Sequence, residues 1–216
     1  MRRAQLDSTS TLAPARATIE DRMAGDAARA PASYADVLAA PEHVVAEVVE
    51  GVLYTNPRPA MPHAAATSAI GEELGPPFKR GRGGPGGWIL LDEPELHLGA
   101  DILVPDLAGW RRERLPHVPD APFLDVAPDW ACEVLSARTQ RLDRMKKVPV
   151  YGRERVRHLW LVDPRARTVE ILRLDGERYL LLGTWGEDQR ARLEPFDAIE
   201  LDLSVFWADV VLGPEE

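Results

Sequence analysis

Hydrophobic residues in this chain occur in short runs, and the pattern inside most runs is typical of β-strands. Residues 43–49 and 52–55 are β-branched runs on either side of Glu50 and Gly51, which predicts a hairpin with Gly51 at a positive φ. Residues 130–135 form a nearly continuous apolar run with one acid, as expected of a buried strand. Further strands are predicted at residues 88–92, 95–98, 102–110, 158–162, 168–174, 178–184 and 198–203.

Helical spacing is confined to four segments between these runs. Ser33 can cap a short helix over residues 34–39, and an Ala-rich stretch predicts a helix over residues 63–74. Two more helices are predicted, over residues 139–151 and from Ser204 onward. The order helix, hairpin, helix, strands, helix, strands indicates an α/β protein with a mixed β-sheet flanked by α-helices.

The length of 216 residues and an apolar fraction of 45% suit one domain with an ordinary core. Residues 1–31 have no apolar period, so we expect a disordered N-terminal tail followed by a single domain over residues 32–216. No apolar run approaches the roughly 20 residues of a membrane span, and no signal sequence is evident. The single cysteine, Cys132, cannot form an internal disulfide, which favours a cytoplasmic location.

The net charge of −9 argues against a general nucleic-acid-binding surface, because neutralising phosphates requires surplus Lys and Arg. Residues 138–167 depart from this average, since they hold ten Lys or Arg residues against three acids. A basic zone on an acidic protein is compatible with a surface that faces phosphates. It is equally compatible with a well-solvated helix and turn.

Two acids stand out because their neighbours are apolar. Asp106 follows Pro105 inside residues 102–110, and Glu133 lies inside residues 130–135. A carboxylate on a buried strand is costly unless it is paired, protonated or bound to a cation. Two such carboxylates on neighbouring strands would form an oxygen-rich site for Mg²⁺, which takes one or two carboxylates and keeps several waters. The alternative is that each acid lies at a strand end and meets Lys, Arg or water.

Several stretches in a fixed order carry a resemblance to known nucleases. They are residues 46–54, His63 at the head of a helix, residues 104–108, residues 132–136, Lys147 with Tyr151, and residues 158–164. The Pro-Asp pair, the later glutamate and a following lysine resemble the PD-(D/E)xK nuclease core. More closely, the chain is similar to the bacterial Uma family of putative restriction endonucleases. This resemblance implies a restriction-endonuclease-like fold and an endonuclease that acts on DNA with Mg²⁺, or alternatively Mn²⁺.

The resemblance also implies roles, position by position. Asp106 and Glu133 would bind the metal together with the backbone carbonyl of Val134, and Glu47 would complete the acidic cluster. The metal would polarise the scissile phosphate and help to generate hydroxide for in-line attack. A lysine would orient the attacking water or stabilise developing charge.

That lysine departs from the simple motif, in which it lies two residues after the glutamate. Here that position is Leu135, and the matching lysine is Lys147 on the predicted helix. Asp143, Lys147 and Tyr151 are spaced four apart, so they share one face if the helix is regular.

Pro149 complicates this assignment, because proline removes a backbone donor and clashes with the carbonyl four residues earlier. A kink there could misplace Lys147, leaving Lys146 as a substitute or no working lysine. Without a lysine, the chain would be a catalytically inactive domain of the same fold that binds nucleic acid or protein. We expect His63 to lie at the surface, and we expect a homodimer by analogy with the fold.

Overall fold

The computed structural model describes residues 30–211. The chain divides after Pro31 into two units, and the first of these, Met1–Pro31, lies almost entirely outside the described residues. The predicted tail, and the predicted division into a tail and one domain, therefore stay predictions. No helix in the described part is long and apolar enough to span a membrane.

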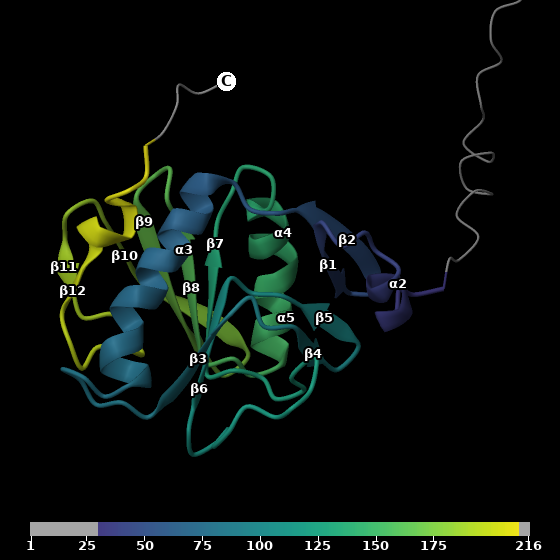
Figure 1. Cartoon of the computed structure of the whole chain (residues 1–216), viewed down its shortest axis with the longest axis horizontal. Coiled ribbons are helices and arrows are strands. Elements are labelled where there is room, and N and C mark those ends of the chain that lie inside the picture. The colour runs from purple at the N-terminus through teal and green to yellow at the C-terminus, as the bar shows by residue number, and fades with distance from the viewer. Residues whose placement is uncertain (1–29, 212–216) are drawn as a thin grey trace, which may run out of the picture. The chain divides into compact units, whose positions relative to one another are not determined.

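Two β-sheets form the frame of the second unit, which begins at Ala32 (Figure 1). One has six strands in the order β10-β9-β8-β7-β6-β3, the other has four in the order β2-β1-β5-β4, and β11 pairs with β12 alone. In the six-stranded sheet β7 and β8 run parallel and the other neighbours are antiparallel, so the predicted mixed sheet is confirmed. The strands are β1 Val44–Val49, β2 Val52–Pro57, β3 Trp88–Asp92, β4 Leu96–Leu98, β5 Asp101–Leu103, β6 Leu107–Arg111, β7 Trp130–Val134, β8 His158–Asp163, β9 Thr168–Asp175, β10 Arg178–Gly186, β11 Arg190–Ala191 and β12 Leu201–Asp202.

Helices cover both faces of the six-stranded sheet, which completes the predicted α/β architecture. Apolar residues of α3 pack with one side of β7, and apolar residues of α5 pack with the other side. The helices are α2 Tyr34–Leu38, α3 Met61–Leu74, α4 Gln140–Leu142 and α5 Val148–Arg153, with π-helical segments at Gly75–Lys79 and Asp143–Lys147 and a 3₁₀ helix at Leu203–Trp207.

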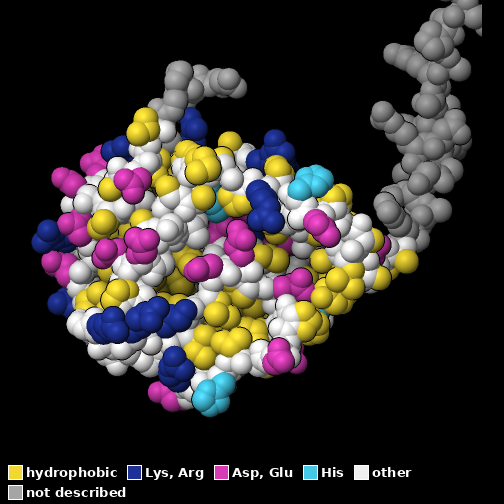
Figure 2. All heavy atoms as spheres, in the orientation of Figure 1, with side chains coloured by type: hydrophobic (Ala, Val, Ile, Leu, Met, Phe, Trp, Pro, Cys, Tyr) yellow, Lys and Arg dark blue, Asp and Glu magenta, His cyan; other side chains and the backbone are white. Residues whose placement is uncertain are grey.

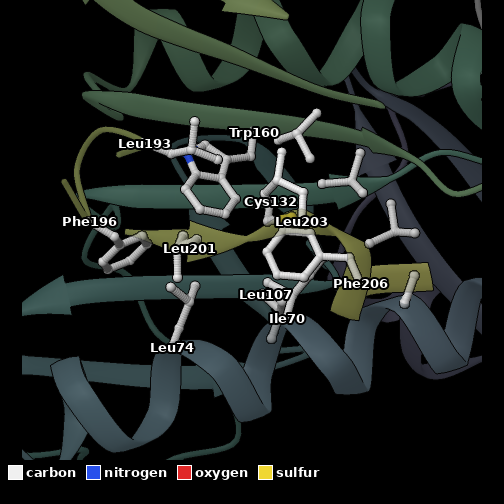
Figure 3. Close-up of a cluster of buried hydrophobic side chains, with 14 of the residues drawn as sticks. Ile70, Leu74, Leu107, Cys132, Trp160, Leu193, Phe196, Leu201, Leu203 and Phe206 are labelled. Carbon is white, nitrogen blue, oxygen red and sulfur yellow. The ribbon is translucent and has the colours of Figure 1, made fainter. Parts of the chain in front are cut away.

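The core beside α3 contains several aromatic side chains packed around Phe196. Phe196 lies with its ring centroid 4.9 Å from that of Trp130 and 5.6 Å from that of Trp160. Figure 3 shows Ile70 and Leu74 of α3 reaching toward this cluster from the opposite side. Because these side chains are fully or almost fully buried, their removal from water is a main source of stability for this half of the fold.

The single strand predicted over residues 102–110 is wrong. It is two strands, β5 and β6, which belong to different sheets. The break falls at Pro105, which has no N–H to give to a strand ladder. Asp106 therefore lies on the connection between the two sheets rather than inside a strand.

The helix predicted over residues 139–151 is present as three successive segments: α4, the π-helical turn Asp143–Lys147, and α5. Pro149 lies in the first turn of α5, where a missing backbone donor is tolerated best. The helix is irregular just before Pro149, where the π-helical turn Asp143–Lys147 leads into α5. At the C-terminal end, the strand predicted over residues 198–203 is reduced to β12.

Candidate active site

Asp106 is held through both of its carboxylate oxygens. Oδ2 accepts a hydrogen bond of 2.6 Å from the backbone N–H of Val134, and Oδ1 lies 3.2 Å from Nε2 of His63. The first contact ties the connection after β5 to the end of β7, so Asp106 and Glu133 are brought to neighbouring positions. The second contact shows that the expectation of a surface histidine is wrong, because His63 is buried on the first turn of α3.

The imidazole of His63 is influenced by two opposing effects. Burial lowers its pKa, but the hydrogen bond and the charge of Asp106 raise it, and the net pKa is above the ordinary value. The hydroxyl of Thr67 donates to the backbone carbonyl of His63 at 3.0 Å and lies 3.5 Å from Nδ1. The ring is thus fixed from both sides, with Nε2 facing Asp106.

Lys147 lies at the centre of a buried acidic cluster and is only 2% exposed. Its Nζ is 2.9 Å from Glu47 Oε1, 2.9 Å from Glu133 Oε1 and 3.8 Å from Asp143 Oδ1. Burial lowers the pKa of this lysine, but the charges of Glu133, Glu47 and Asp143 outweigh burial and raise it well above its usual value. Lys147 therefore stays a cation in the interior.

Glu133 is engaged by two donors from the same helical face. Tyr151 donates its hydroxyl to Oε1 at 2.5 Å, and Lys147 donates to Oε2 at 2.9 Å. Burial raises the pKa of Glu133 well above its usual value even though Lys147 opposes this shift. Burial likewise raises the pKa of Asp143 to about 6. The predicted common face of Asp143, Lys147 and Tyr151 is therefore present, and it points inward.

The two neighbouring lysines have different surroundings. Lys146 is exposed and forms an ion pair of 2.6 Å with Glu50 in the β1–β2 turn. Glu47 on β1 accepts from Lys147 and also from the backbone N–H of Val104 at 2.8 Å.

The position two residues after Glu133 is Leu135, which is buried and apolar. Lys147 thus reaches the glutamate from a helix, whereas the simple motif places the lysine on the strand.

The cluster opens into a cavity of about 400 Å³ lined by Glu47, Asp106, Glu133 and Lys147 among others. A second cavity of about 860 Å³ runs beside α3, and both cavities include Arg58, Pro59, His63 and Glu93 in their walls. In Figure 2, a row of Lys and Arg side chains lies near the lower end of α3, with hydrophobic side chains reaching the surface beside it. The acidic cluster therefore borders the smaller cavity, and the two cavities share part of their walls.

The oxygen ligands beside the cavity suit a small divalent cation, but they are few and partly engaged by other groups. Within residues 30–211, no three His, Cys, Asp or Glu side chains form a group that could hold a metal ion. The two carboxylates of Asp106 and Glu133 with the Val134 carbonyl match Mg²⁺, which binds through one or two carboxylates and retains water. Any cation that uses Glu133 must share its carboxylate with Lys147 and Tyr151.

Two contributors were missed or undervalued by sequence reasoning. Tyr151 was recognised by its spacing but was given no contact, and His63 was placed at the surface. The signal for Tyr151 was its position four residues after Lys147. The signal for His63 was weaker, because a histidine at the head of a helix has no feature that predicts which carboxylate it will meet.

The fold and the buried Lys–carboxylate cluster together define an α/β protein of the restriction-endonuclease-like class. The family model described as "Putative restriction endonuclease" (Uma2) matches residues 32–205, and the chain belongs to this family. The family suggested by the sequence is thereby confirmed. Among solved structures, the chain is similar to a "putative nuclease belonging to DUF820" from Anabaena variabilis, with 22% identity and a TM-score of 0.64. That match covers 82% of this chain and 98% of the other, and it supports the fold. The search of curated proteins gave no match.

Proposed function

We propose that this protein is a Mg²⁺-dependent endonuclease that hydrolyses phosphodiester bonds of DNA. The observation that carries the proposal is the convergence of Asp106, Glu133 and Lys147 on one cavity from three separate parts of the chain. Burying the Lys147 ammonium 2.9 Å from Glu133 carries a large desolvation cost. A buried ion pair is therefore weak evidence for a purely stabilising role, and its position beside the cavity supports a functional one. Membership of the family agrees with this chemistry.

The proposed metal ligands are Asp106, Glu133 and the carbonyl of Val134, as the resemblance implies. A bound Mg²⁺ would supply Lewis-acid stabilisation of phosphate charge and lower the pKa of a bound water. The N–H of Val134 and the ring of His63 fix the orientation of the Asp106 carboxylate through their contacts with its two oxygens. This pre-organisation reduces the entropy that would otherwise be lost on binding.

Lys147 would stabilise negative charge on the phosphate or orient the attacking water, because it lines the cavity beside Glu133. Glu47 would hold Lys147 in place through the ion pair of 2.9 Å, and we therefore assign it a positioning role. Mn²⁺ is the alternative ion, since carboxylate, carbonyl and water ligands suit both metals.

One observation favours a second candidate, a catalytically inactive domain that binds nucleic acid or protein. Both oxygens of Glu133 already accept hydrogen bonds, from Lys147 and Tyr151. If that network is too stable to admit a cation, the site is a structural ion-pair cluster.

Plasmid cleavage in Mg²⁺ tests the choice between the two candidates. We expect Asp106→Asn and Glu133→Gln each to lower the cleavage rate by about 100-fold or more, because each would remove a metal ligand. Glu113→Gln and Asp120→Asn are matched controls, since both residues are exposed and line neither cavity.

Calorimetric titration with Mg²⁺ and with Mn²⁺, on the same variants, gives a readout that does not depend on the substrate. Binding by the wild type that is lost in Asp106→Asn and in Glu133→Gln supports the metal site. Absence of both metal binding and cleavage in the wild type would overturn the catalytic proposal in favour of the inactive domain.

The proposal also includes a cellular location and an oligomeric state. We place the protein in the cytoplasm, because its single cysteine, Cys132, is fully buried and has no disulfide partner. We propose a homodimer by analogy with the fold, because most soluble oligomers are symmetric and dimers are the commonest. Light scattering after size-exclusion chromatography tests the dimer, and a mass of one chain would refute it.

A further inference from the structure

Three arginines line the cavity above the acidic cluster and come from three different connections. Arg58 follows β2, Arg138 follows β7, and Arg165 follows β8. All three side chains are exposed, and their guanidinium groups make no hydrogen bond or ion pair with the described residues. They are therefore cations held at the mouth of the cavity without a protein anion to neutralise them.

This lack of partners distinguishes them from many other arginines in the described part of the chain. Within the basic zone of residues 138–167, Arg144 forms a bidentate pair with Glu170, and Arg153 pairs with Asp101. The basic zone is thus not one continuous surface, because several of its charges are neutralised internally. Further arginines with a partner are Arg111, Arg112, Arg114, Arg155, Arg173, Arg190 and Arg192.

The sheet topology explains why Arg138 and Arg165 line the same cavity. β7 and β8 are the parallel pair of the six-stranded sheet, so their carboxyl ends lie at the same edge. Arg138 and Arg165 lie just beyond those two ends. In sheets with parallel strands, ligands bind in the crevice outside the carboxyl ends. Arg58 faces the same cavity from the other sheet, and it also lines the larger cavity beside α3.

The charge distribution in this cavity is layered. Glu47, Glu133 and Asp143 surround Lys147 in the interior with Asp106 in the same cavity, whereas Arg58, Arg138 and Arg165 and one acid, Glu93, line it as exposed residues. An acidic interior alone would repel a polyanion. Arginines at the rim offset that repulsion and offer planar donors suited to phosphate oxygens.

We propose that Arg58, Arg138 and Arg165 form a phosphate clamp that binds the backbone of a nucleic-acid strand on either side of the bond to be cut. This inference rests on the proposed function and adds to it the groups that hold the substrate. The clamp contacts phosphates, so it positions the strand and carries no base-sequence preference of its own.

Salt-dependent binding of a fluorescent 20-base-pair DNA duplex, and of the matching single strand, tests the clamp in EDTA, where cleavage cannot occur. The test variant changes Arg58, Arg138 and Arg165 together to Ala. The control variant changes Arg82, Arg157 and Arg178 to Ala, which removes the same charge from exposed arginines that line neither cavity. Fluorescence anisotropy is followed between 50 and 200 mM KCl.

We expect the test variant to bind about tenfold or more weakly at 50 mM KCl, with a slope of log K against log [KCl] shallower by roughly 0.9 per arginine for duplex and roughly 0.7 for single strand. The control variant should keep the wild-type slope. Equal losses in the two variants, or no loss in either, would overturn the clamp while leaving the proposed function intact. A wild type that binds neither nucleic acid in EDTA would also overturn the clamp, whereas the proposed function is decided separately by the cleavage and metal-binding measurements.

Discussion

The two faces of β7 show how one strand can support two kinds of interior. Trp130, Cys132 and Val134 point to the α3 side, into a cluster of aromatic and aliphatic side chains. On the other face, Ala131 joins the apolar cluster around α5, and Glu133 meets Lys147 and Tyr151. Both interiors are almost completely buried, but only the second holds charge.

The two faces of β7 should therefore tolerate different substitutions. Apolar packing is non-directional, so the α3 side should depend on volume and hardly on pH. The Lys147 side depends on the balance of charges, because a buried charge that loses its partner is strongly destabilising. Single substitutions on each face should separate these two kinds of stability.

The largest effect is expected for Lys147→Met, which removes the cation from the cluster. Glu47 and Glu133 would then be buried without their counter-ion, at a cost of about 3–5 kcal/mol in the free energy of unfolding at pH 7. Urea denaturation measures this loss. Lys146→Met is the matched control, since its pair with Glu50 is exposed and screened by water, and should contribute far less to stability. Similar values for the two variants would show that the buried cluster is not a charge-balanced unit.

Tyr151→Phe should be less costly, because it removes only a hydroxyl and preserves the packing of the ring. Glu133 would lose its hydrogen bond of 2.5 Å, which we expect to lower stability by about 1–3 kcal/mol. The comparison residue is Tyr179, whose hydroxyl donates to the backbone carbonyl of Val156 outside the cluster. Tyr179→Phe should cost about 1 kcal/mol, so a larger loss there than at Tyr151 would contradict the special role of the acidic cluster.

The pH dependence of stability should contain a contribution from Asp143, whose pKa is about 6 in the folded protein and 3.8 for the unperturbed group. A carboxyl with a raised folded pKa binds more protons when folded, so its contribution is fully present below pH 3.8 and is lost as pH rises through 6. The stability of the wild type relative to Asp143→Asn should therefore fall by about 1–3 kcal/mol between pH 4 and pH 7. Urea titrations at four pH values measure it, and a constant difference would refute the shift.

The smallest effect is expected for Phe196→Leu on the apolar side. The loss of part of the ring should cost about 1–2 kcal/mol, and this cost should change by less than about 0.5 kcal/mol between pH 5 and pH 8. Phe196 is fully buried among the rings of Trp88, Trp130 and Trp160. A marked pH dependence for this variant would mean that the two faces of β7 are coupled.

Much of the local structure could be predicted because it depends on neighbours in the sequence. The hairpin around Glu50 and Gly51 was predicted from its turn residues, and both have positive φ in the structure, at 52° and 76°. The strand Trp88–Asp92 was predicted with its observed bounds. Such features depend on side-chain alternation and turn chemistry, which are visible in a short window.

Long-range partners explain the predictions that were wrong. Residues 102–110 have the composition of one strand, but β5 pairs with β1 and β4 while β6 pairs with β3 and β7. Pro105 permits the break, and only the competition among distant partners decides that it occurs. In the same way, the burial of His63 follows from where Asp106 ends up, which no helical pattern contains.

The α/β class, most of the strands and the acidic residues Asp106 and Glu133 could be predicted from the sequence. They could be predicted because periodicity, turn residues and isolated charges in apolar runs are local properties. Three features follow from the packing of distant segments: Lys147 rather than Lys146 contacts the acids, His63 contacts Asp106, and Arg58 lines one cavity with Arg138 and Arg165. These outcomes depend on packing between segments far apart in the chain, where the energy of a buried charge is set by whichever groups the fold brings beside it.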